Sequence, residues 1–204
     1  AYSSFSGELA SIVQRFLREN WIDAPNRAGK RPGAFCSYTV PSHHPYVLLN
    51  WTGRSRDVAT LAHELGHAFH NECAYQANKT VLQQSTPATL AETASIMCET
   101  IVTEAVLAQT NDPQEILGIL EAQLNNASSV IVDIYSRYLF EQEVFERREK
   151  SELSADDFND IMERAQKSTY GDGLDEKYLQ KYMWTWKPHY YSSGLSFYNY
   201  PYAF

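Results

Sequence analysis

Two histidines four residues apart, with a glutamate directly after the first, stand in the stretch LAHELGHAFH at residues 61–70. Apolar residues recur around them with the helical period, which predicts a helix. On a helix, His63 and His67 project from the same face, so both imidazoles can reach one metal ion at about 2.0 to 2.1 Å. Glu64 lies one step round the helix, where it can act as a general base toward a metal-bound water.

A catalytic zinc site needs a third protein ligand and one open position for water. His70 lies about 10 Å along the helix axis from His63 and is too distant to share its ion. Cys73 stands where one zinc-peptidase pattern has its third histidine, but the glycine that turns the chain in that pattern is absent. Glu92 remains, on a following glycine-free helix whose small residues allow close approach. The other interpretation of Glu92 is a surface acid.

Ser95 and Glu99 share the face of Glu92, three and seven residues further on. One of them is expected to accept a hydrogen bond from the second ring nitrogen of a ligand histidine, which would fix the orientation of the ring.

The composition excludes several classes of protein. A formal charge of -8, with 17 basic against 25 acidic residues, argues against a nucleic-acid partner. No apolar run approaches the length of a membrane span, and we expect no membrane partner. Three widely spaced cysteines form neither a disulfide framework nor a zinc knuckle, which favours a cytoplasmic location and inert thiols.

The elements around the motif predict a mainly α fold with a small β-sheet or hairpin near residues 34–51. The amphipathic stretch 7–21 predicts a helix, and the aromatic and β-branched runs at 34–40 and 46–51 predict strands. Asp57 or Ser55 is placed to cap the helix that carries the histidines.

Further helices are expected downstream. Pro87 and Pro113 stand where a first helical turn tolerates proline, and the second of these helices is expected to break near 125–129. Ser154 and Asp157 approximate a capping box for a last helix. No repeat or linker interrupts the chain, so residues 1–204 are expected to form a single domain.

The chain resembles the oligoendopeptidase F branch of the thimet oligopeptidase-like metallopeptidases. The likeness rests on TLAHELGHAFH, on LAETASIMCE beyond it, on GKRPGAFCSY and YVLLNWTG upstream, and on the tail HYYSSGLSFYNYPYAF. It implies a zincin-like helical catalytic lobe, one zinc ion held by His63, His67 and Glu92, and cleavage of short oligopeptides.

By the same resemblance, His189 and one or two of the following tyrosines contact the substrate or the tetrahedral intermediate. Tyr198 is the first choice and Tyr200 the second. Members of this family are usually some three times longer, so we expect a fragment whose partner is the remainder of the peptidase.

The expected function is therefore a zinc-dependent endopeptidase with Glu64 as general base. The alternative is a non-catalytic helical lobe that binds zinc structurally or presents a peptide-binding face, which a fourth protein ligand would indicate. A zinc hydrolase acting on another substrate class is the remaining possibility.

Overall fold

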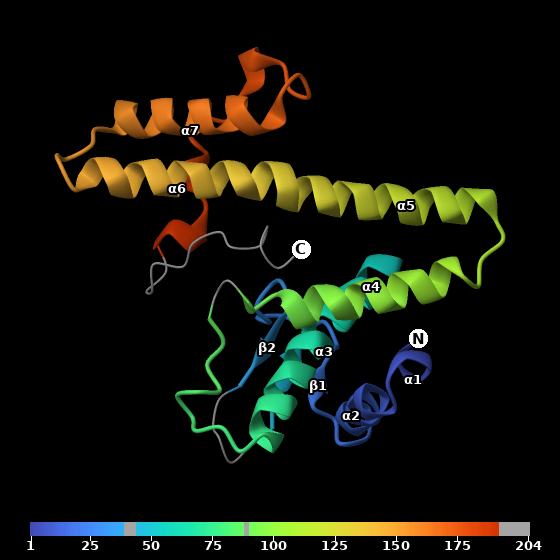
Figure 1. Cartoon of the computed structure of the whole chain (residues 1–204). Coiled ribbons are helices and arrows are strands. Elements are labelled where there is room, and N and C mark those ends of the chain that lie inside the picture. Colours follow the sequence, from blue (N-terminus) through green and yellow to red (C-terminus); the bar gives the residue numbers. More distant parts are fainter. Residues whose placement is uncertain (39–43, 88–89, 192–204) are drawn as a thin grey trace. The chain divides into compact units, whose positions relative to one another are not determined.

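The computed structural model describes residues 1–38, 44–87 and 90–191, and divides into two units, 1–119 and 120–204. It confirms the expectation of a mainly helical fold with a small sheet (Figure 1). Among the described residues, no helix has the length and apolar character needed to cross a membrane.

The first unit begins with two helices, α1 (Tyr2–Phe5) and α2 (Gly7–Arg18). Three short strands follow: β1 (Ile22–Asp23), β2 (Phe35–Ser37) and β3 (Tyr46–Leu48). The strand order is β1-β3-β2, with β1 parallel and β2 antiparallel to β3. The predicted strands are thus confirmed, while β1 was not expected.

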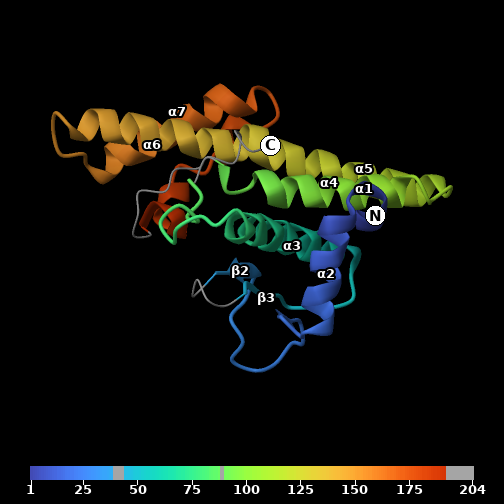
Figure 2. The same ribbon diagram turned by 60° about the horizontal axis from the view of Figure 1, so that its bottom comes forward.

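Helix α3 (Ser55–Gln76) carries the two histidines and runs straight past His70, as the missing glycine predicted. It contacts the sheet and also α4 (Thr93–Leu107), and Figure 2 shows it between the two. The core of this unit joins α2, the sheet and α3 through the buried residues Ile12, Phe16, Trp21, Val47, Leu49, Leu65 and Ala68.

Helix α4 begins at Thr93, six residues after Pro87, so the expectation that Glu92 lies inside the helix is wrong. Pro87 instead opens a separate turn, in which the backbone N–H of Leu90 donates to the Pro87 carbonyl at 2.9 Å. Glu92 is the N-cap residue of α4. Its side chain consequently leaves the chain at the end of the helix rather than from its flank.

Helix α5 (Pro113–Ser128) starts at its predicted proline and crosses the division between the units. A π-helical turn (Ser129–Ile134) follows close to the expected break and leads into α6 (Tyr135–Arg148). Helix α7 (Ala155–Tyr170) returns antiparallel to α6 (Figure 1). Its N-cap Ser154 and Asp157 form the predicted capping box.

Three 3-10 turns complete the second unit at Glu176–Tyr178, Met183–Thr185 and Pro188–Tyr191. A second core holds this unit together, with Phe140, Val144, Ile161, Met162, Ala165 and Met183 buried between α6, α7 and the Met183–Thr185 turn.

Candidate metal centre and active site

Three side chains in the first unit bring their ligand atoms together. The Nε2 atoms of His63 and His67 lie 3.2 Å apart, because the two rings project from successive turns of α3. An Oε2 atom of Glu92 lies 3.0 Å from Nε2 of His63 and 3.3 Å from Nε2 of His67. The structure therefore places the three predicted ligands in one nearly equilateral triangle.

These separations fit a tetrahedral metal ion. Ligands about 2.0 to 2.1 Å from a tetrahedral zinc ion stand about 3.3 to 3.4 Å from one another, which is close to the three distances found here. Two imidazoles and one carboxylate are also a ligand set that suits zinc. Among the described residues, this group of possible metal ligands has three members and no fourth. Such a set leaves one position open.

Two residues of α4 form hydrogen bonds that orient the ligand side chains. Nδ1 of His63 lies 2.5 Å from Oε1 of Glu99, so this carboxylate accepts the Nδ1–H and leaves Nε2 free to bind a metal ion. The Ser95 hydroxyl, which is fully buried, donates to Oε2 of Glu92 at 2.8 Å. Glu99 thus takes the predicted role toward a histidine, whereas Ser95 supports the third ligand instead.

Glu64 is buried beside this triangle, with 5% of its surface exposed. Burial raises the pKa of its carboxyl, while the backbone N–H of Cys36 on β2 donates to the carboxylate and opposes that rise. A carboxylate with a raised pKa is a better proton acceptor. Sequence reasoning did not find the Cys36 backbone contact, because it depends on how β2 packs on α3.

The ligand side chains shift one another's pKa values. Burial lowers the pKa of His63, but the carboxylates of Glu92 and Glu99 outweigh it and raise this pKa to about 10. Burial opposes ionisation of Glu92, yet hydrogen bonds from His63 and His67 hold its pKa well below the usual range. Both shifts favour a protonated imidazole beside an ionised carboxylate, so a divalent cation that binds here competes with a proton.

The remaining predicted site residues belong to the second unit. His189 lies in the Pro188–Tyr191 turn, and its side chain is not described. Tyr198 and Tyr200 lie outside the described residues. Their contact with substrate stays a prediction.

The three cysteines are free thiols, as expected. Burial raises the pKa of Cys36 to about 12 and that of Cys98 to about 11, which disfavours the reactive thiolate. Cys36 contributes to the centre through its backbone N–H, which donates to Glu64, and not through its thiol.

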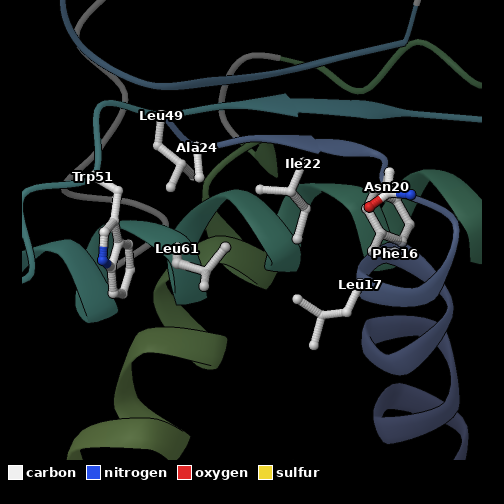
Figure 3. Close-up of a pocket in the computed structure, with 8 residues that line it drawn as sticks. All are labelled: Phe16, Leu17, Asn20, Ile22, Ala24, Leu49, Trp51 and Leu61. Carbon is white, nitrogen blue, oxygen red and sulfur yellow. The ribbon is translucent and has the colours of Figure 1, made fainter. Parts of the chain in front are cut away.

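A surface hollow of the first unit lies apart from this chemistry. Figure 3 shows its lining, which is apolar except for the Asn20 amide and the Trp51 indole nitrogen, and consists of Phe16, Leu17, Asn20, Ile22, Ala24, Leu49, Trp51 and Leu61. No residue of the metal centre is among them. The hollow has no group that can activate water.

Comparison with known proteins identifies the family of the chain. The family model described as peptidase family M3 matches residues 8–204. The chain belongs to peptidase family M3. It is 31% identical over 202 residues to the chromosomal oligoendopeptidase F of Lactococcus lactis subsp. cremoris, covering 98% of this chain and 32% of that protein.

Other similar proteins also match nearly the whole of this chain over about a third of their own length. Oligopeptidase PepF of Bacillus subtilis is 28% identical, over 96% of this chain and 29% of its own length. The crystal structure of a peptidase from Chlamydophila abortus superposes with a TM-score of 0.75 at 26% identity, covering 97% of this chain and 33% of that one. This chain therefore spans about a third of the length of the M3 proteins it matches.

Proposed function

We propose that this chain is the zinc-binding catalytic part of an oligoendopeptidase that hydrolyses short peptides. The observation that carries the proposal is the triangle of His63, His67 and Glu92 beside the buried carboxylate of Glu64. Three ligands with an open position are typical of catalytic zinc sites, whereas structural sites have four. This argues against the non-catalytic alternative.

Each residue of the site has its own role in the proposed reaction. Zinc, when bound, supplies a Lewis acid that lowers the pKa of a water from 15.7 toward about 7. Glu64 accepts the proton as the water attacks the scissile carbonyl, and then returns this proton to the leaving amine. Glu99 and Ser95 hold His63 and Glu92 in their orientations throughout.

The sheet supports a peptide as the substrate class. Strand β2 is an outer strand, paired on one side to β3, and its Cys36 touches Glu64. An extended peptide can add to such an edge through main-chain hydrogen bonds, which would bring its own carbonyls toward the general base. Strand β3 pairs with β1 on one side and β2 on the other and cannot take this role.

Metal analysis and peptide cleavage on matched variants test the proposal. The wild-type chain, His63→Ala and Glu64→Gln are loaded with zinc, dialysed and assayed with short internally quenched peptides. We expect about one zinc per chain in the wild type and in Glu64→Gln, and much less in His63→Ala. Glu64→Gln should cleave about 100- to 10,000-fold more slowly, the usual contribution of general acid-base catalysis.

Near-normal cleavage by Glu64→Gln would contradict its role as base. Equal zinc content in His63→Ala and the wild type would contradict the metal site. Zinc binding without any cleavage by the wild type would contradict activity of this chain while leaving the metal centre supported.

A further inference from the structure

Gly66 stands in the middle of α3, between the two ligand histidines. Glycine is the least favourable residue for a helix interior after proline. Its backbone does not need a left-handed conformation here, since the positive φ angles among the described glycines occur at Gly29, Gly33, Gly53 and Gly171. The reason for glycine at this position must therefore be space rather than conformation.

The space is taken by the backbone of α4. A Cβ atom at position 66 would lie 2.6 Å from Cα of Ser95 and 2.8 Å from the carbonyl carbon of Ala94, and closer still to the Ala94 carbonyl oxygen. Carbon atoms in contact prefer about 3.5 to 4.0 Å. Because these neighbours are backbone atoms, no side-chain rotation relieves the clash. Helices α3 and α4 would have to separate locally by about 1 Å.

The contact lies close to the third ligand. Ser95 is three residues from Glu92, and its hydroxyl oxygen lies 2.8 Å from both the Glu92 carbonyl oxygen and the Glu92 carboxylate, two acceptors that share its one proton. A shift of Ser95 therefore moves Glu92 with it. Metal sites tolerate about 0.2 Å in their ligand distances, so a separation near 1 Å is large enough to take this carboxylate out of the ligand triangle.

We propose that Gly66 is a positioning residue for the metal centre: its missing side chain lets α4 approach α3 closely enough for Glu92 to share an ion with His63 and His67. This inference rests on the proposed zinc site. It explains why the residue between the histidines is glycine although a helix interior disfavours it.

A double-mutant cycle on the full chain tests the proposal, with Gly66→Ala, Glu92→Gln and the double variant. Zinc dissociation constants are measured by competition with a chromophoric chelator, and the absorption spectrum of bound Co²⁺ reports the ligand set. We expect Gly66→Ala to weaken zinc binding about 10- to 100-fold, the range for residues that orient ligands. Its Co²⁺ spectrum should shift toward that of Glu92→Gln.

In the Glu92→Gln background, Gly66→Ala should raise the zinc dissociation constant by less than about a further threefold, because the effects of residues that act through one another are not additive. A purely structural role would weaken binding equally in both backgrounds and would overturn the proposal. Gly118→Ala is the matched control, since a Cβ there meets no atom within 4 Å. It should leave zinc binding unchanged.

Glu92→Asp decides the matter if Gly66→Ala does not fold. It withdraws the carboxylate by one methylene without changing the helix contact, and we expect a similar loss of zinc affinity. Full affinity in Glu92→Asp would overturn the proposal, since the reach of Glu92 would then not be limiting. Wild-type protein that binds no zinc would overturn the metal centre itself, whereas equal binding by wild type and Gly66→Ala would overturn this inference alone.

Discussion

The hydrogen bond from His63 to Glu99 controls both the orientation and the basicity of the ligand. A carboxylate that accepts the Nδ1–H favours one tautomer and raises the electron density at Nε2, which strengthens a metal bond there. The contact is half-buried, with 23% of each side chain exposed, so solvent screens it less than it screens a surface pair. Glu99 should therefore contribute measurably to metal affinity.

We expect Glu99→Ala to weaken zinc binding about 10- to 100-fold. Glu99→Gln should fall between this variant and the wild type, because an amide oxygen still accepts the Nδ1–H but carries no charge. Glu104→Ala, on the same helix but exposed, is the control. Chelator competition on the three variants measures the effect, and equal affinities for Glu99→Ala and Glu104→Ala would exclude the role of Glu99.

At this scale the sequence predicted that His63 and His67 share one face, because helical spacing alone places them there. It also placed Ser95 and Glu99 near the centre. It did not tell which supports a histidine and which supports Glu92, since that depends on the angle between two helices. The Cys36 contact with Glu64 was missed for the same reason, because a backbone donor has no signature in the residue type.

At the scale of elements, the start of α3 is held by Asp57. Its Oδ2 accepts from the backbone N–H of Thr52 at 2.6 Å, from the Thr52 hydroxyl at 2.8 Å and from the N–H of Arg54 at 3.1 Å. Arg54 is the N-cap residue of α3. Of the two residues that were predicted to cap the helix, Asp57 forms the capping hydrogen bonds, and it does so from the first turn. A negative charge there also interacts favourably with the positive end of the helix dipole.

These bonds predict a pH-dependent contribution of Asp57 to stability. They lower its pKa below the usual 3.8, with the Thr52 hydroxyl as the largest cause. The stabilisation is therefore complete above about pH 4 and is lost as the pH falls through the lowered pKa. In metal-free protein, Asp57→Ala should melt a few degrees below wild type at pH 7, and the gap should narrow below pH 4.

Thermal melts from pH 7 to pH 2 check this, with the exposed Asp160→Ala as control. A gap that stays constant over the whole range would show that the charge of Asp57 contributes nothing.

Prediction of the elements succeeded where an amphipathic period carries the signal, as in α2 and α3, and where a capping box marks the start of the helix, as in α7. It failed where a contact between residues distant in sequence determines whether an element forms or where it starts. Strand β1 has two residues and exists because it pairs with β3. The helix expected from Pro87 starts late, because proline there marks a separate turn, and helix propensity does not distinguish one turn from the first turn of a long helix.

At the scale of the whole chain, the predicted site residues belong to two different units. The metal ligands, Glu64 and their supporting residues belong to residues 1–119, while the predicted substrate-contacting residues belong to residues 120–204. The division falls inside α5, whose helical pattern continues across it. The sequence therefore carries no linker signal that would reveal two units, and the expectation of a single domain stays a prediction.

The division predicts where zinc stabilises the chain. Because all three proposed ligands lie in the first unit, zinc added to the metal-free full chain should slow amide hydrogen exchange in α3 and at the start of α4, and leave α6 and α7 unchanged. At free zinc 100 times the dissociation constant, exchange that requires opening of the site should slow about 100-fold. Hydrogen exchange read by mass spectrometry measures this, with zinc-treated His63→Ala as the control. Equal protection of α6 and α7 would mean that both units open together, and the metal centre would then stabilise the whole chain rather than the unit that builds it.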